Sequence, residues 1–396
     1  MPWKETCPVS ERLSFMKRLE QGERMTDVCR EFGISRKTGY KLWDRYRRLG
    51  AVGLFDESRR PERSPQRVSE EVEALVVQGR QAHSTWGPRK LHAWLSGQHP
   101  SVRLPSPSTI GDVLKRNGLV SSRRKRRRTP LHDAPLESAL QANDLWCADF
   151  KGQFRLGNHN YCFPLTVTDH FSRFLLTCEG LESTETEPAR KVFELTFREF
   201  GLPSALRTDN GVPFASRGLA GLSRLSVWWL RLGILPERIE PAHPEQNGRH
   251  ERMHLTLKQE TTRPPAQSLL QQQERFDRFV DEYNHERPHE ALGQRPPTVL
   301  FTNSVRPFPN RLPEPEYPLH DDTITVQTGG HVRLGGRRRD PQFFLGNALR
   351  GQRVGVREVG DGVWLVSFMS LDLGHFDVRA NQFFEGSYEP PTERNS

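Results

Sequence analysis

The sequence lacks any apolar run of the roughly 18 residues that a membrane-spanning helix needs. Its first stretch, MPWKETCPVSER, also lacks the apolar segment of a secretory signal peptide. Cysteine is scarce, because the chain has five and no two of them form a C-x-x-C pair. A disulfide framework and a zinc knuckle are therefore not indicated, and we expect reduced thiols that lie mostly in the core. Together these absences predict a cytoplasmic protein with no membrane partner.

Acidic residues are outnumbered by basic residues. Lys and Arg number 58 against 49 Asp and Glu, which gives a net charge of +9 and a pI near 9.5. Such a balance favours a polyanionic partner, and double-stranded DNA is the partner we expect. A length of 396 residues allows about two to four domains and at least one sizeable core.

Residues 1–58 are predicted to form a helix-turn-helix domain. Thr26 can cap a second helix and Ser35 a third, with Gly33 in the turn between them. The alternative is a small structural bundle with a solvated basic face. The third helix opens with polar groups that such helices place in the major groove, namely Arg36, Lys37 and Tyr40.

A second helical DNA-binding domain, of the helix-turn-helix or winged-helix kind, is predicted over residues 66–120. Ser106 can cap its last helix, Pro107 suits the first helical position, and Gly118 suits the end. The helices are expected at 69–81, 88–96 and 106–117.

A basic linker is predicted at 121–140, since the run RRKRRR places six positive charges side by side and cannot pack. A plain solvated tether is the alternative, but we expect an arm that follows DNA phosphates. The cations concerned are Arg123, Arg124, Lys125, Arg126, Arg127 and Arg128.

From residue 141 the pattern changes to strands. Three segments are spaced as an antiparallel meander, and they are DLWCADFKGQF, YCFPLTVTDHF and RFLLTCEGL. Pro164 in the second segment predicts a bulge or an offset register. A helix at 186–200, the strand PSALRTD, a helix near 218–232, the strand GILPERIE and a further helix follow. This β-β-β-α-β-α-β-α order predicts a mixed sheet flanked by helices, as in the ribonuclease H-like fold.

Three carboxylates are placed to converge in that fold. Asp149 lies on the first strand, Asp209 ends the fourth, and Glu251 lies one turn into the last helix. The first and fourth strands are expected to be neighbours. A cluster of this kind can hold two divalent ions about 4 Å apart, which activate an attacking water or 3′-hydroxyl.

Five stretches between residues 143 and 301 carry a resemblance to a known family, and they are DLWCADFKG, LTVTDHFSRFLL, LRTDNGVPF, HPEQNGRHERMHLTLKQE and YNHERPHEALGQRPPTVLF. They resemble transposases and integrases with a retroviral-integrase-like core, in particular bacterial insertion-sequence transposases. The resemblance implies a DDE active site made of Asp149, Asp209 and Glu251 within a catalytic core at 141–301. It also places Lys258 on the helix face of Glu251, where it would hold a DNA phosphate, and leaves Glu245 as the reserve third acid.

Other polar residues have simpler interpretations. Asp169 is expected to build the turn TDHFSR rather than to bind metal. His250 and His254 have no zinc-finger spacing, and we expect them to face DNA or solvent. The stretch YNHERPHEALG is expected to be structural, with Arg287 as a candidate phosphate contact.

The C-terminal part is predicted to be a separate β-rich domain. After a Pro-rich linker at 302–319, residues 320–388 contain short alternating apolar runs split by glycines, which favour a small barrel. The resemblance implies an SH3-like domain that grips DNA, and GGRRRD at 335–340 offers a basic loop for it.

The prediction is therefore a bacterial, nucleoid-associated DDE transposase. It would bind the terminal inverted repeats of its element, use two Mg²⁺ ions, with Mn²⁺ as an alternative, to cut and join strands, and act as a homo-oligomer in a synaptic complex. Two rivals remain: a DNA-binding regulator with a decayed nuclease core, and a ribonuclease H-like nuclease without strand transfer.

Overall fold

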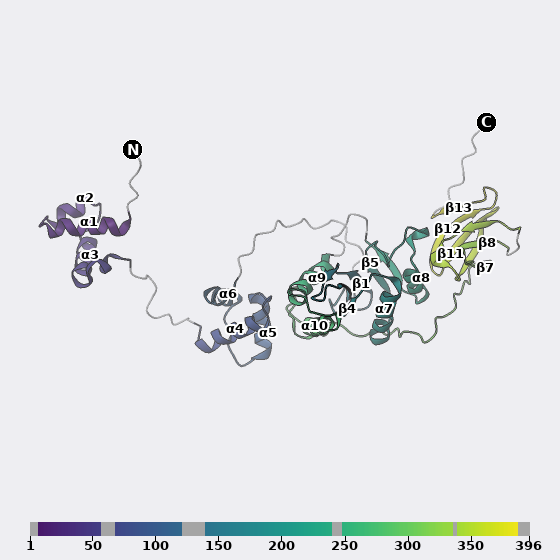
Figure 1. Ribbon diagram of the computed structural model, residues 1–396, viewed down its shortest axis with the longest axis horizontal. Coiled ribbons are helices and arrows are strands. Elements are labelled where there is room, and N and C mark those ends of the chain that lie inside the picture. The colour runs from purple at the N-terminus through teal and green to yellow at the C-terminus, as the bar shows by residue number, and fades with distance from the viewer. Residues whose placement is uncertain (1–6, 57–67, 121–138, 240–247, 336–338, 387–396) are drawn as a thin grey trace, which may run out of the picture. The chain divides into compact units, whose positions relative to one another are not determined.

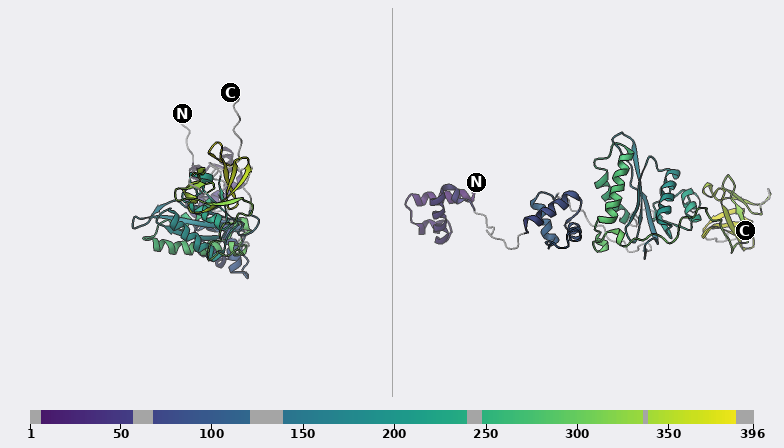
Figure 2. Two further views of the ribbon diagram at one scale, coloured as in Figure 1. Left: turned by 90° about the vertical axis from the view of Figure 1, so that its right-hand side faces the viewer. Right: turned by 90° about the horizontal axis from the view of Figure 1, so that it is seen from below.

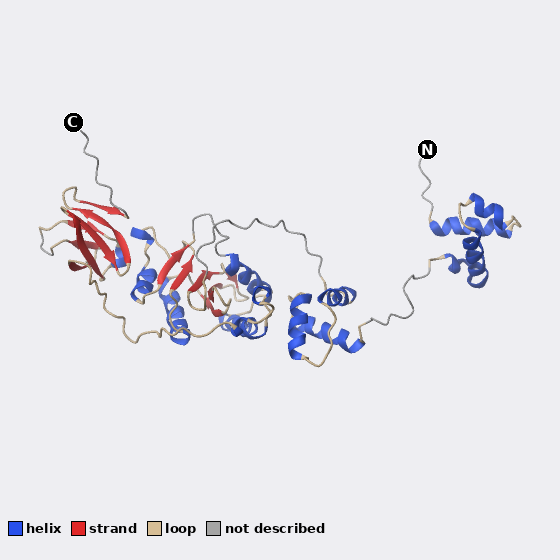
Figure 3. Cartoon of the chain, turned by 180° about the vertical axis from the view of Figure 1, so that it is seen from behind, coloured by secondary structure: helices blue, strands red, loops and turns tan. Residues whose placement is uncertain are grey.

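The structure is a computed structural model that describes residues 7–56, 68–120, 139–239, 248–335 and 339–386 (Figure 1). The chain divides into two units, Met1–Val68 and Ser69–Ser396. Figure 3 shows that helices dominate before residue 120 and strands dominate at the C-terminal end. Across the described ranges, no helix is both long and apolar enough to cross a bilayer.

The first unit is a three-helix domain, and its helices are α1 (Pro8–Glu20), α2 (Met25–Glu31) and α3 (Arg36–Leu49). Ser35 caps α3 as predicted, because its side-chain oxygen accepts from the Thr38 N–H. The predicted Thr26 cap is wrong. The carbonyl of Arg24 already accepts from the amides of Asp27 and Val28, so α2 starts before Thr26.

Gly39 lies inside α3, where glycine costs helix stability relative to alanine. The packing explains why it is there. Gly39 is buried, and a Cβ built on it would lie 2.5 Å from Cys29 Sγ and 2.9 Å from Met25 Sδ. The glycine therefore lets α2 and α3 approach more closely than any side chain would allow.

The second unit begins with three further helices, α4 (Glu70–Ala82), α5 (Pro88–Gln98) and α6 (Pro107–Arg116). The side-chain oxygen of Ser106 accepts from the Thr109 N–H, Pro107 is the first helical residue, and Gly118 has a φ of +68°. The predicted boundary residues of α6 are thus confirmed. Apolar residues of all three helices share one core with Trp86, which is fully buried.

A six-stranded mixed sheet follows. Its strands are β1 (Leu145–Phe150), β2 (Phe154–Arg155), β3 (Tyr161–Asp169), β4 (Leu175–Leu181), β5 (Ala205–Thr208) and β6 (Leu235–Arg238). The order is β2-β3-β1-β5-β6, with β4 also paired to β3. β3 pairs antiparallel with β1 and β4, whereas β5 pairs parallel with β1 and β6. The predicted meander is confirmed and consists of β1, β3 and β4. The strands predicted to be first and fourth are β1 and β5 here, and they are neighbours as predicted.

The register irregularity predicted at Pro164 occurs further along β3. Pro164 pairs in register with Gly180, and its carbonyl accepts from the Lys151 N–H. The shift lies between Val167 and Thr168. Pro164 is therefore accommodated without a bulge at its own position.

Helices cover both faces of this sheet (Figure 2). On one face, α7 (Thr186–Phe200) and α8 (Arg224–Arg231) pack on the β1 residues Trp146 and Ala148. On the other, α9 (Gly248–Thr261) and α10 (Leu269–Asp281) pack on Cys162 and Cys178. The predicted mixed sheet flanked by helices is thus confirmed, and the order of its elements is as predicted apart from the additional short strand β2.

The C-terminal part is all β, with β7 (Asp322–Thr325), β8 (His331–Arg333), β9 (Gln342–Phe344), β10 (Arg353–Gly360), β11 (Val363–Phe368), β12 (Leu371–Asp377) and β13 (Gln382–Glu385). Five of these strands form an antiparallel sheet in the order β13-β12-β11-β10-β7, and β8 pairs with β9. The β-rich content is as predicted, while closure into a small SH3-like barrel stays a prediction. The basic run at 123–128 and residues 336–338 of GGRRRD lie outside the described residues.

Candidate active site

Two of the three predicted acids lie at the same edge of the sheet. Asp149 is near the end of β1, and Asp209 directly follows β5. The strands are parallel neighbours in which Cys147 pairs with Arg207, so continuing this register brings Asp149 level with Asp209. Glu251 lies in the first turn of α9.

The charges of two of these acids act on the third. Burial raises the pKa of Asp149 to about 7, and the charges of Asp209 and then Glu251 add to the rise. The side chain of Asp149 is only 20% exposed, so water screens this repulsion poorly. The charges of Asp209 and Glu251 therefore reach Asp149, and the opposing charge of Lys151 does not cancel the rise.

This cluster fits a hard divalent cation by its chemistry, since Mg²⁺ prefers carboxylate oxygens and would offset the repulsion that raises the pKa of Asp149. Among the described residues, however, no three His, Cys, Asp or Glu side chains stand close enough to hold an ion together. Three carboxylates that repel one another are expected to stay apart when no cation draws them together.

The Asn-Gly turn after Asp209 serves the acid itself. The Gly211 N–H donates to Asp209 Oδ1 at 3.1 Å, and a Cβ on Gly211 would lie 3.1 Å from Asp209 Oδ2. Asn210 Nδ2 donates to the Ile239 carbonyl at 2.8 Å, which ties the turn to the chain after β6. The turn thus fixes the Asp209 carboxylate as well as reversing the chain.

The two histidines beside Glu251 do not face DNA or solvent, so that prediction is wrong. His250 is 2% exposed and His254 is 7% exposed, and both lie on the buried face of α9 with Met253 and Leu257. This i, i+3, i+4, i+7 spacing is the sequence signal for the buried face of a helix, but it is usually sought among apolar residues. Burial lowers the pKa of His250 to about 3 and that of His254 to about 2, so both rings are neutral.

Thr166 is a residue of this site that sequence reasoning missed. It pairs with Asp149 across β1 and β3, and its side chain is fully buried. Its Oγ1 lies 2.7 Å from the Nε2 atoms of both His250 and His254 and 3.1 Å from the Asp149 carbonyl oxygen. Cross-strand pairing is non-local, so nothing in the order of residues indicates this contact.

Asp169 builds its turn, as predicted. Its Oδ1 accepts from the amide and the hydroxyl of Ser172, and its Oδ2 accepts from the Asn143 N–H. The prediction that Arg287 contacts phosphate is wrong, because this residue is 6% exposed and its guanidinium pairs with Glu260 at 2.8 Å.

Two lysines, one exposed and one partly buried, lie near the acids. Lys258 is exposed on α9, and its charge acts with burial to lower the pKa of Lys151, which follows Asp149 by two residues. The two lysines therefore flank the cluster, although sequence reasoning singled out Lys258 alone. On α3, the predicted DNA-binding residues Arg36, Lys37 and Tyr40 are exposed. Glu245 lies outside the described residues.

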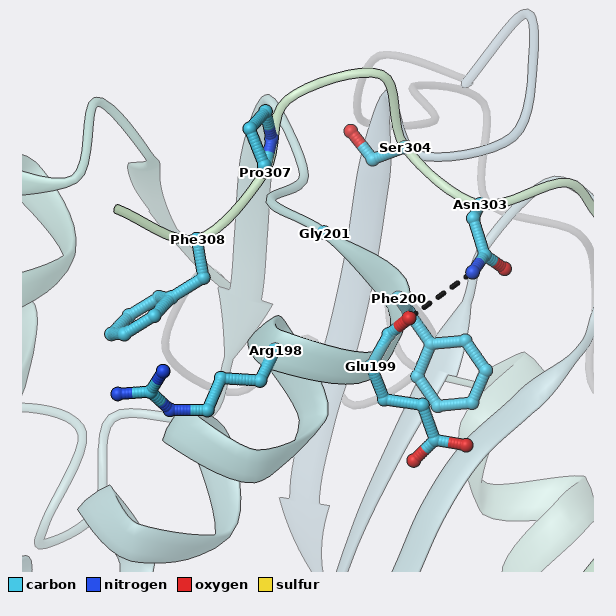
Figure 4. A pocket seen from close by; sticks show the side chains of 8 residues that line it. All are labelled: Arg198, Glu199, Phe200, Gly201, Asn303, Ser304, Pro307 and Phe308. Carbon is cyan, nitrogen blue, oxygen red and sulfur yellow. Dashed lines mark hydrogen bonds between the residues drawn. The ribbon is translucent and has the colours of Figure 1, made fainter. Parts of the chain in front are cut away.

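A cavity away from the three acids is formed where two segments of the chain pack together. A cavity of about 340 Å³ lies where residues 303–308 pack on the end of α7, and none of the three acids lines it (Figure 4). There Asn303 Nδ2 donates to the Glu199 carbonyl, and the Arg198 guanidinium lies 4.8 Å from the Phe308 ring centroid.

Comparison with known proteins finds family models over the helical part of the chain and over its central mixed sheet. Residues 139–244 and 232–297 match two family models that are both described as an integrase core domain. Residues 11–62 match a helix-turn-helix domain, and residues 38–114 match a homeodomain-like domain.

Similar proteins include two from bacterial insertion elements. An uncharacterized protein of insertion element IS476 from Xanthomonas euvesicatoria is 27% identical over 253 residues, which cover 64% of this chain and 70% of that protein. A protein of insertion element IS407 from Burkholderia multivorans is 25% identical over 257 residues, covering 62% of this chain and 86% of that protein. The HTLV-2 integrase catalytic core domain, solved with magnesium, is 14% identical with a TM-score of 0.33, covering 41% of this chain and 99% of that one. The chain thus carries an integrase core domain behind helix-turn-helix DNA-binding domains, and its resemblance to the transposases and integrases is confirmed.

Proposed function

We propose that this chain is a DDE transposase that binds the terminal inverted repeats of its element and cuts and joins DNA strands with Mg²⁺, or with Mn²⁺ in its place. The observation that carries the proposal is the charge coupling at the sheet edge, where Asp209 and Glu251 both raise the pKa of Asp149. A carboxyl group whose pKa is raised strongly by burial and by neighbouring acids is costly to stability when it is charged, and such groups are typical of catalytic sites.

Asp149, Asp209 and Glu251 would hold two divalent ions. When bound, such ions supply an activated water or 3′-hydroxyl and stabilise the leaving oxygen of an in-line displacement. Two strand ends and their turns position Asp149 and Asp209, and Gly211 orients the second of these carboxylates. Lys258 and Lys151 would bind the phosphates on either side of the scissile bond.

DNA recognition is assigned to the helical domains and to the C-terminal β domain. The exposed first turn of α3 would enter the major groove through Arg36, Lys37 and Tyr40. The β-rich domain would add an SH3-like, sequence-independent grip. Joining two ends requires a synaptic homo-oligomer, so we expect at least two protomers to assemble on paired ends.

The test is to incubate the full chain with labelled duplexes that carry the ends of its element, in Mg²⁺, Mn²⁺ or EDTA. Products longer than the substrate are expected with either metal and not with EDTA. Asp149→Asn, Asp209→Asn and Glu251→Gln should each abolish joining while end binding stays within about threefold, since these changes remove metal ligands and leave the DNA-binding surfaces intact.

The outcomes separate the rivals. Specific binding of ends without metal-dependent nicking would support the regulator, and nicking without joining would support the simple nuclease. Glu245→Gln is the matched control and should stay active, whereas its inactivity together with an active Glu251→Gln would move the third acid to residue 245.

A further inference from the structure

Glu251 is bracketed on α9 by two buried histidines that contact the same hydroxyl group. His250 precedes it by one residue, His254 follows it by three, and the Nε2 atom of each lies 2.7 Å from Thr166 Oγ1. We infer that Thr166, His250 and His254 act as positioning residues, here called the threonine latch, which hold Glu251 at its working position relative to Asp149. This inference rests on the proposed function.

The geometry of the threonine latch fixes which of its groups donate hydrogen bonds and which accept them. A threonine hydroxyl donates once and accepts twice, and Thr166 Oγ1 has three partners. The Asp149 carbonyl can only accept, so the hydroxyl donates to it over 3.1 Å and accepts from both histidines. Both neutral rings therefore carry their proton on Nε2.

With this assignment both ring nitrogens of His250 have hydrogen-bond partners, and His254 makes no hydrogen bond to the Asp149 carboxylate. With its proton on Nε2, His250 accepts at Nδ1 from the Thr168 hydroxyl at 2.9 Å. His254 Nδ1 then carries a lone pair and lies 3.7 Å from Asp149 Oδ2, which is too far for a hydrogen bond. The latch thus binds the helix without donating a histidine proton to the Asp149 carboxylate.

The latch connects two of the acids by a short path. Thr166 lies opposite Asp149 in the register of β1 and β3 and is bonded to the backbone of Asp149 itself. From the same hydroxyl, one hydrogen bond reaches α9 on each side of Glu251. The first turn of a helix has unpaired amides and frays unless tertiary contacts hold it, so these two bonds restrain the turn that carries the acid.

The polarity of the latch argues for positioning rather than for stability alone. The neighbouring buried residues of α9, Met253 and Leu257, are apolar and pack well against α10 and the sheet. Apolar residues in place of the histidines would avoid burying polar groups, whereas a satisfied polar network fixes one arrangement of helix on sheet. The two polar residues, His250 and His254, lie one residue before and three residues after Glu251, the predicted acid.

The test compares three variants of the full chain. Thr166→Val removes the hydroxyl at nearly constant volume, and Thr166→Ser keeps it. Thr196→Val is the matched control, because Thr196 is also buried, donates to the Val192 carbonyl at 2.8 Å, and lies in α7 on the opposite face of the sheet.

Three quantities are measured: the Mg²⁺ concentration for half-maximal joining, the rise in melting temperature caused by Mn²⁺, and amide exchange at residues 252–256. Thr166→Val should raise the half-maximal Mg²⁺ concentration about tenfold or more, because removing a group that orients metal ligands typically weakens metal binding about 10- to 100-fold. It should also abolish most of the Mn²⁺ shift and speed amide exchange by about three- to tenfold. Thr166→Ser should stay within about threefold of the wild type.

Thr196→Val should lower the melting temperature but leave the Mg²⁺ dependence unchanged. If Thr166→Val behaves in the same way, with wild-type metal dependence and wild-type exchange at 252–256, the latch is a structural contact only and the inference is overturned. A wild-type chain that shows neither a Mn²⁺ shift nor joining would overturn the proposed function, and the exchange data would still decide whether Thr166 restrains α9.

Discussion

At the scale of single residues, Asp149 and Asp169 show how two buried aspartates on neighbouring strands can have opposite roles. Asp169 is fully buried, but its oxygens accept three hydrogen bonds from the turn that it builds. Asp149 lies beside two other acids, whose charges add to the effect of its own burial. The first carboxylate stabilises the fold, whereas a charge on the second is costly to it, and in the proposed function a bound cation would offset that cost.

This difference predicts how Asp149→Asn changes stability with pH. The pKa of Asp149 rises from 3.8 to about 7 on folding, so the folded chain binds the extra proton between these values and stability falls as pH rises through that window. In EDTA at pH 8 we expect Asp149→Asn to be more stable than the wild type by about 1–4 kcal/mol. The difference should fade toward pH 4, as followed by urea unfolding.

Asp169→Asn is the control for that prediction. An amide cannot accept from Ser172 at one end and from Asn143 at the other, so this variant should be less stable than the wild type at pH 8. Equal effects of the two substitutions at pH 8 would show that repulsion among the acids does not govern the stability of the free protein.

At the scale of elements, local chemistry predicted most helix boundaries, and the pattern of strands predicted which strands are neighbours but not which residues pair across them. Ser35 and Ser106 begin their helices where the sequence indicates, since caps act over a few residues. The positions of Asp149 and Asp209 at neighbouring strand ends could be predicted because strand ends and motif spacing are local features, whereas their role together with Glu251 stays a prediction. Thr166 could not be predicted, because its partnership with Asp149 depends on strand register, and the buried face of α9 was missed because two of its members are histidines.

The close approach of α2 and α3 predicts an unusual response to alanine. Alanine favours helix, yet Gly39→Ala should destabilise the first unit by about 1–3 kcal/mol, because the added Cβ would meet Cys29 Sγ. Gly97→Ala in α5 is the control, since a Cβ there meets no described atom within 4 Å, and it should be neutral or stabilising by up to about 1 kcal/mol. Calorimetry of the full chain would follow both, and a stabilising Gly39→Ala would contradict the packing at this site.

The exposed start of α3 predicts a loss of specificity when its cations are removed. Arg36→Ala and Lys37→Ala should each weaken end binding by about 1–3 kcal/mol for every base that the side chain reads, with less effect on random duplex. Arg30→Ala on α2 removes the same charge from a side chain that is 78% exposed and should affect both duplexes alike. Equal effects on ends and random DNA for all three variants would mean that α3 binds phosphates only.

At the scale of the whole molecule, the excess of positive charge is divided between elements that read DNA and a segment that can only attract it. The net charge is +9, and six cations stand together in RRKRRR. In the proposed function, Asp149, Asp209 and Glu251 would repel DNA phosphates until a cation is bound. Attraction from the rest of the chain must therefore bring the duplex to the acids, and it need not be specific to do so.

The run RRKRRR carries the last prediction, which concerns the salt dependence of binding. Cations that neutralise DNA phosphates release counterions, so each neutralised phosphate adds about 0.9 to the slope of log affinity against log salt. Replacing all six residues with neutral ones should flatten that slope by up to about five units, and by fewer if some of them do not touch phosphate. Preference for end DNA over random DNA should survive, because base recognition lies elsewhere. Replacing the five arginines with lysine keeps the charge and should keep the slope, whereas a slope that neither change alters would make this segment a tether.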